Sequence, residues 1–134
     1  MRGTTVNGID DRGFGQTTPP PEAQTLLDTV DGDRREAEEL AELFLRGTRE
    51  QLEAMKAAAA AGQFDRVTPL AHKCSGSSSA CGLAELADLL RTLEKLPPEE
   101  RAGRGAANLL AQAEAEFLRV ERALRGYFGG RTSP

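Results

Sequence analysis

Apolar and polar positions follow the period of an amphipathic helix in four separate stretches of this chain. The first stretch runs from Arg34 to Ala61, and its apolar stripe consists of Leu40, Leu43, Phe44, Leu52, Met55 and Ala59. Gly47 and Thr48 interrupt this stripe, which predicts a kink or a short break in the helix. Gly62 then provides a helix stop.

The second stretch combines a seam of small side chains with a proline. Its apolar and small residues follow a three-four spacing and share one helix face: Phe64, Val67, Ala71, Cys74, Ser78 and Cys81. Pro69 fits either inside the early turns of the helix or at its first position, with Thr68 as the N-cap. We expect the earlier start, near Asp65, and an end at Gly82.

Two further helices are expected in the rest of the chain. Leucines at helical spacing predict the third helix over 83–96, and Pro97 and Pro98 end it. The segment 99–105 is a poor helix interior because it contains Gly103 and Gly105. The fourth helix is expected at about 106–128, with an apolar face of Leu109, Leu110, Ala113, Phe117, Val120 and Leu124.

Four amphipathic helices with short connections most simply form an antiparallel four-helix bundle, so we expect an all-α fold. The composition agrees, because 39% of residues are hydrophobic but only 4% are aromatic, which leaves a core of Leu, Ala and Val. Residues 1–24 are rich in Gly, Thr and Pro, and they predict a flexible tail. The helical domain is expected at 25–128, followed by a frayed tail at 129–134.

Charge, hydropathy and cysteine content argue against several classes of function. The net charge of −4 without a basic stripe argues against nucleic-acid binding. No segment approaches the roughly 20 apolar residues that span a membrane, and the N-terminus lacks a signal-peptide core, so we expect a cytoplasmic protein. Cys74 and Cys81 lie about 10 Å apart along one helix, too far for a disulfide, and the chain lacks the ligand pattern of a zinc site. Both thiols are expected to be buried.

The single histidine, His72, lies next to the seam residue Ala71 and about 100° around the helix from it. Its imidazole is therefore expected at the edge of the packed face or outside it, on a polar face with Thr68, Ser75 and Ser79. Gly76, four residues later, places no side chain beside it, although a helix-interior glycine costs about 1 kcal/mol relative to alanine. Close approach by another molecule would explain this glycine, and tight packing between helices is the alternative.

The run from Leu70 to Gly82, LAHKCSGSSSACG, resembles the signature of histidine phosphotransfer (Hpt) domains. The family pattern places Ala before the His, Lys three residues after it, Gly four after it and Gly ten after it. Ala71, His72, Gly76 and Gly82 match this pattern, and the resemblance extends over roughly residues 25–128. Ser75 stands where many members carry the lysine.

The resemblance implies that His72 accepts a phosphoryl group from a receiver-domain aspartate and passes it to another receiver. The implied partners are receiver domains or a hybrid sensor histidine kinase. The residues expected to support the phosphoryl group or access to it are Lys73, Ser75, Gly76 and Ser79. Those expected to contact the partner are Thr68 and Ser75. No cofactor is expected on this chain, Mg²⁺ is expected in the receiver, and the chain is expected to be monomeric and without kinase activity of its own.

A non-catalytic adaptor is the main alternative, in which the same bundle binds receivers or other partners without carrying phosphate. Ser75 in place of the family's lysine favours this alternative. A plain interaction bundle with an incidental histidine is a third hypothesis, and a thiol sensor using Cys74 and Cys81 is a weaker one.

Overall fold

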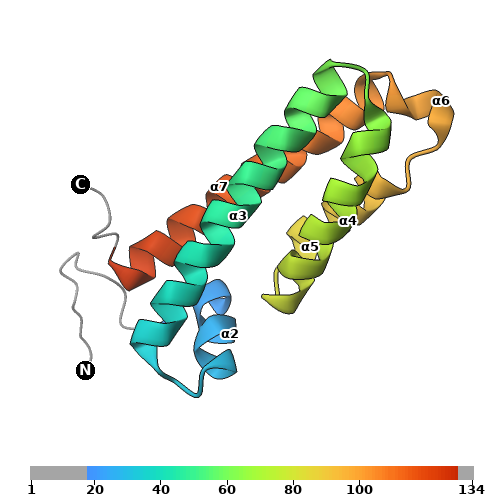
Figure 1. Cartoon of the computed structure of the whole chain (residues 1–134). Helices are drawn as coiled ribbons and strands as arrows, with labels where there is room; N and C mark the ends of the chain where they lie inside the picture. Colours follow the sequence, from blue (N-terminus) through green and yellow to red (C-terminus); the bar gives the residue numbers. More distant parts are fainter. Residues whose placement is uncertain (1–17, 130–134) are drawn as a thin grey trace. The chain divides into compact units, whose positions relative to one another are not determined.

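The computed structural model describes residues 18–129, and every regular element in that range is a helix (Figure 1). The elements are α2 (Pro21–Thr29), α3 (Arg34–Ala60), α4 (Phe64–Ala80), α5 (Ala84–Glu94), α6 (Pro98–Arg101) and α7 (Arg104–Phe128). The all-α prediction is confirmed. Residues 1–17 and 130–134, which fall in the predicted tails, lie outside the described residues.

Two compact units divide the described residues, and α3 and α7 each contribute to both. The first unit contains residues 18–41 and 120–129. Within it, the Arg34 guanidinium donates to the backbone oxygen of Tyr127 at 2.9 Å and stacks 4.7 Å from the centre of the Tyr127 ring. Helix α2 belongs to the same unit and buries Ala23, Leu26 and Leu27.

Helix α2 corrects the predicted tail over residues 1–24. It begins at Pro21, so the tail prediction is wrong for residues 21–24. Proline is tolerated at the first helical position, where the missing N–H would have had no partner within the helix. The prolines therefore start a helix here, and burial of its apolar face stabilises it.

The second unit, Glu42–Arg119, contains the predicted four-helix bundle: α3 from Glu42, α4, α5, and α7 up to Arg119. The Lys56 ammonium on α3 forms an ion pair with Glu114 on α7 at 3.2 Å. The Arg49 guanidinium lies 5.1 Å from the ring centre of Phe117, which joins the same two helices. Helices α4 and α5 pack against each other as an antiparallel pair (Figure 1).

Helix α3 runs without interruption through Gly47 and Thr48, so the predicted kink or break is wrong. Thr48 is only 2% exposed, and its packing offsets the low helix propensity of the Gly-Thr pair. The apolar stripe also differs from the prediction. Leu43 is exposed, Leu40 and Ala59 are only half-buried, and Leu45 and Ala58 are buried.

Helix α4 begins at Phe64, close to the predicted start, and contains Pro69 within its second turn. Its predicted seam is confirmed at the centre, where four side chains have no exposed surface: Val67, Ala71, Cys74 and Ser78. Gly82 follows with a φ of 76°, a left-handed conformation that suits glycine and ends the helix. The single-turn helix α6 lies in the segment predicted to be a poor helix, and Pro98 starts it.

Candidate functional site

His72 lies on the open edge of α4, with its side chain 75% exposed. The neighbouring seam residues Ala71 and Cys74 are fully buried, so the rotation of α4 is fixed by packing. A rigid helix therefore presents the imidazole to solvent, as the helical spacing predicts.

The Nδ1 atom of His72 lies 2.9 Å from Oε2 of Glu94, the last residue of α5. An ionised carboxylate only accepts hydrogen bonds, so this contact requires the proton on Nδ1. Nε2 then carries the lone pair of the neutral imidazole. The contact thus fixes the ring and leaves its nucleophilic nitrogen free.

Glu94 was not among the site residues predicted from the sequence, although the spacing contains a signal for it. His72 and Glu94 each lie eleven residues from Leu83 in the turn between α4 and α5. In an antiparallel helix pair, residues equally distant from the turn lie at about the same level. Counting outward from Leu83 would therefore have identified Glu94 as the residue facing His72.

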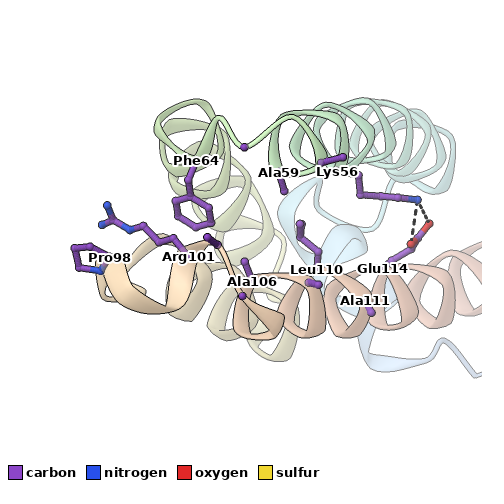
Figure 2. A pocket seen from close by; sticks show the side chains of 14 residues that line it. Lys56, Ala59, Phe64, Pro98, Arg101, Ala106, Leu110, Ala111 and Glu114 are labelled. Carbon is purple, nitrogen blue, oxygen red and sulfur yellow. Dashed lines mark hydrogen bonds and ion pairs between the residues drawn. The ribbon is translucent and has the colours of Figure 1, made fainter.

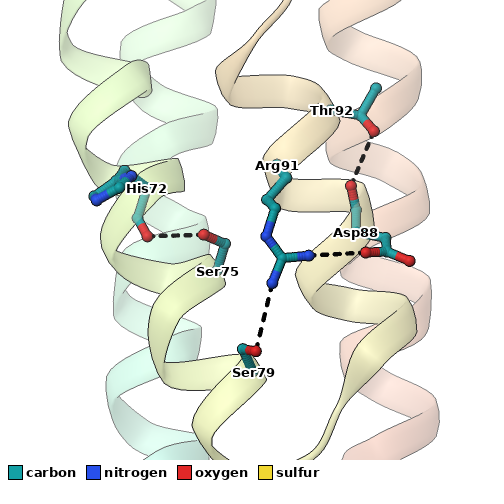
Figure 3. Close-up of polar contacts among 6 residues, drawn as sticks. All are labelled: His72, Ser75, Ser79, Asp88, Arg91 and Thr92. Carbon is teal, nitrogen blue, oxygen red and sulfur yellow. Dashed lines mark hydrogen bonds and ion pairs between the residues drawn. The ribbon is translucent and has the colours of Figure 1, made fainter.

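Ser75 corrects the expectation of a continuous polar face beside His72. It is only 5% exposed, and its hydroxyl donates to the backbone oxygen of His72 at 2.8 Å (Figure 3). Three residues correspond to about 300° of helical rotation, which turns Ser75 about 60° back toward the buried seam. Its hydroxyl hydrogen is therefore used within α4.

The other predicted site residues surround His72 on α4. Gly76 is exposed, and a Cβ placed on it would meet nothing within 4 Å. Lys73 and Ser79 are exposed, whereas Thr68 is half-buried and its hydroxyl donates to the backbone oxygen of Phe64 at 3.3 Å. The structure thus places open surface, rather than side chains, next to the imidazole on the Gly76 side.

A polar cluster on α5 faces this part of α4 (Figure 3). Arg91 donates through Nη1 to Oδ1 of Asp88 at 2.8 Å and through Nη2 to the Ser79 hydroxyl oxygen at 3.4 Å. The Thr92 hydroxyl donates to the backbone oxygen of Asp88 at 2.9 Å. Arg91 was also missed from sequence, because a helical pattern alone does not show which residues of two helices meet.

A groove of about 740 Å³ lies elsewhere in the second unit, between the α3–α4 turn, α6 and the start of α7 (Figure 2). Lys56, Phe64, Arg101 and Glu114 line it, together with alanines of α3 and α7. None of the predicted site residues lines this groove. His72, Lys73, Gly76 and Ser79 lie instead on the exposed surface of α4.

The two cysteines are both free thiols. Burial raises the pKa of Cys74 to about 11, and the Ser78 hydroxyl acts weakly in the opposite direction. Burial also raises the pKa of Cys81, which is half-buried. Because the thiolate is the reactive form, neither environment activates a thiol at neutral pH.

Residues 18–129 contain neither a metal-binding cluster nor a membrane-spanning helix. No group of three or more His, Cys, Asp or Glu side chains in this range is arranged to hold a metal ion. No helix in the same range has the length and apolar character needed to cross a membrane.

Comparison with known protein families matches residues 39–124 to the Hpt domain. This range covers more than half of the chain and includes the whole of α4 and α5. Neither the curated proteins nor the solved structures give a match. Hpt domains perform histidine phosphotransfer in phosphorelays and interact with receiver domains. The family match and the exposed histidine of a helical bundle agree, and the chain belongs to the Hpt domain family.

Proposed function

We propose that Nε2 of His72 accepts a phosphoryl group from the aspartyl phosphate of a receiver domain and passes it to an aspartate of a second receiver. One observation carries this proposal. The imidazole is 75% exposed while its Nδ1 is held 2.9 Å from Glu94, so Nε2 is both accessible and unprotonated in the neutral ring.

The transfer balances without a further reactant. The Nε2 lone pair attacks phosphorus, the bond from phosphorus to the aspartate oxygen breaks, and the receiver aspartate leaves as a carboxylate. The Nδ1 proton stays in its hydrogen bond to Glu94, which disperses the positive charge that develops on the ring. In the second step an aspartate attacks phosphorus, and Nε2 leaves with the bonding electron pair.

This chain provides access to His72, and the receiver provides the charged groups that stabilise the transferred phosphoryl group. Phosphoryl transfer depends mainly on positioning and on electrostatic stabilisation. The open surface at Gly76 lets a receiver approach the imidazole, and half-buried Thr68 and exposed Ser79 border the approach. We propose that the receiver supplies Mg²⁺ together with its acidic site, and that this chain binds no cofactor.

The test is phosphoryl transfer from a panel of phosphorylated receivers or hybrid kinases, with Mg²⁺, to the wild type and to His72→Gln. The expected result is an acid-labile, alkali-stable label on the wild type alone. An established phosphotransfer domain serves as the positive control for each donor. Equal labelling of wild type and His72→Gln would contradict the assignment of His72.

The adaptor is the second candidate, and burial of Ser75 favours it, because this position offers the phosphoryl group neither a charge nor a free hydroxyl hydrogen. It predicts that receivers bind the wild type and His72→Ala with the same affinity. It also predicts no label on the wild type from donors that label the control domain. That pair of results would replace the carrier function with the adaptor.

A further inference from the structure

A phosphoryl group on His72 would bring up to two negative charges to the junction of α4 and α5. The charged side chains near this junction are Lys73 on α4 and four residues of α5 and its C-terminal cap: Asp88, Arg91, Glu94 and Lys95. Glu94 already binds Nδ1 and adds negative charge. A cation from this set would stabilise the phosphorylated state most directly, because charge-assisted hydrogen bonds to phosphate are strong.

Two of the three cations are poorly placed. Lys73 lies about 100° around α4 from His72, on the side opposite to Ser75 and Ser79, and therefore turns away from α5. Lys95 caps the C-terminal end of α5 one residue beyond Glu94, and it lines a hollow toward α6 together with Arg91, Pro97 and Glu100. Both are exposed to solvent.

Arg91 lies at the required level. It is three residues before Glu94, which places it about 4.5 Å along α5 from the residue that contacts His72. Arg91 and Ser75 are each eight residues from Leu83, so Arg91 stands opposite the turn of α4 that follows His72. Its side chain extends from α5 toward α4, where its guanidinium lies next to Ser79 (Figure 3).

The present partners of Arg91 leave its guanidinium available. The ion pair to Asp88 lies on the surface, with side chains 44% and 75% exposed, and such pairs are weak and readily exchanged. The contact to Ser79 is long, at 3.4 Å. A guanidinium has five N–H groups in a planar fork that matches phosphate oxygens, so it can bind a phosphoryl group through two of them.

We propose that Arg91 turns from Asp88 toward His72 and binds the oxygens of the phosphoryl group on Nε2. This inference rests on the proposed function, because it names the residue of this chain that neutralises the phosphoryl charge. Arg91 on α5 then supplies the positive charge beside the phosphoryl group, because Lys73 on α4 turns away from α5.

The test measures the second ionisation of the phosphoryl group on His72 by ³¹P NMR as a function of pH. Phosphoramidate phosphorylates the protein without a receiver: a bond forms between Nε2 and phosphorus, the P–N bond of the reagent breaks, and ammonia leaves. A cation within about 4–6 Å favours the dianion, so Arg91→Gln is expected to raise the titration midpoint by about 1 pH unit. Arg91→Lys is expected to restore part of the difference.

Arg66→Gln is the matched control. Arg66 is an exposed arginine of α4, six residues before His72 and about 120° around the helix from it. The same loss of charge at this position is expected to leave the midpoint unchanged. If Arg91 only held α4 and α5 together, Arg91→Gln would lower the melting temperature without moving the midpoint.

The outcomes separate this inference from the proposed function. Equal midpoints for wild type and Arg91→Gln would overturn the role of Arg91, while labelling by receivers would still support His72 as the carrier. Failure of every receiver to label the wild type would overturn the carrier function, whatever the ³¹P titration shows. Absence of a His72 phosphoryl signal with phosphoramidate would contradict an accessible Nε2, and with it both proposals.

Discussion

The packed and open faces of α4 each carry a side chain able to act as a nucleophile, and the two side chains differ in their exposure to solvent. Cys74 is fully buried, and burial raises its pKa to about 11. His72, two residues earlier and about 200° around the helix, is 75% exposed. The comparison shows that the rotation of α4, fixed by its seam, decides which nucleophile a partner can reach.

The same buried seam also brings a hydrogen-bond acceptor to the exposed imidazole of His72. Its central residues are small or short, so α5 packs closely against α4, and the Glu94 carboxylate reaches Nδ1 of His72. Packing on the buried face of α4 thus makes possible the contact between Glu94 and His72 at the edge of its open face. Changes at Cys74, Glu94 and Gly76 test this division between the two faces, and their expected effects decrease in that order.

The largest effect concerns ionisation of Cys74 on the packed face. Its pKa is about 11 in the folded protein against an ordinary value of 9.0, so the folded state holds the proton more tightly. The protonated thiol contributes roughly 2–3 kcal/mol to the free energy of unfolding. This contribution is complete below pH 9 and is lost as the pH rises from 9 through 11. Urea unfolding between pH 8 and pH 11 measures this loss.

Cys74→Ala provides the comparison for that series. The variant is less stable at pH 8, but its free energy of unfolding should fall less steeply with pH than that of the wild type. Parallel pH profiles for the two proteins would show that Cys74 does not ionise on unfolding. That result would contradict the claim that burial on the packed face suppresses ionisation of this thiol.

The next effect concerns the contact of Glu94 with the open face. Glu94→Ala removes the acceptor of the Nδ1 proton, and we expect transfer to slow about threefold to tenfold, in line with the loss of one partly exposed charged hydrogen bond. Long-range ¹H–¹⁵N spectra should show the imidazole change from the Nδ1–H form to a mixture of tautomers.

Glu85→Ala is the control for Glu94, because Glu85 is an exposed glutamate in the first turn of the same helix. It should change neither the transfer rate nor the His72 tautomer. A Glu94→Ala protein that keeps both the wild-type rate and the Nδ1–H tautomer would remove Glu94 from the site.

The smallest effect concerns Gly76. An added methyl group meets nothing within 4 Å in the isolated chain, and alanine is the better helix former, so Gly76→Ala should raise the free energy of unfolding by about 1 kcal/mol. The same methyl group should slow transfer from a receiver, because we propose that the receiver approaches at Gly76. Phosphorylation by phosphoramidate should stay at the wild-type rate, and an equal slowing with both donors would argue against a docking effect.

Helical spacing was sufficient to predict the features that depend on one helix at a time. It gave the seam of α4, the early start of that helix despite Pro69, and the exposure of His72. These follow because a period of 3.6 residues fixes which positions share a face.

Features that depend on a second element were missed or misplaced. Ser75 lies at the edge of the α4 face, and whether such an edge is covered depends on how closely the neighbouring helices pack. Glu94 and Arg91 required the register between α4 and α5, and that register is set by the turn at Gly82. The first four residues of α2, 21–24, were predicted as tail because the Gly, Thr and Pro content of residues 1–24 suggests disorder, whereas burial of Leu26 and Leu27 stabilises the helix.

The most direct test of the central claim is to identify the phosphorylated atom after transfer from a receiver. ¹⁵N-labelled protein, phosphorylated by a receiver with Mg²⁺, would be examined by ³¹P and ¹⁵N NMR under alkaline conditions. Phosphohistidine at Nε2 of His72 is expected, with the Nδ1 proton still directed to Glu94. A phosphoryl group on Nδ1, or on any other residue, would contradict it.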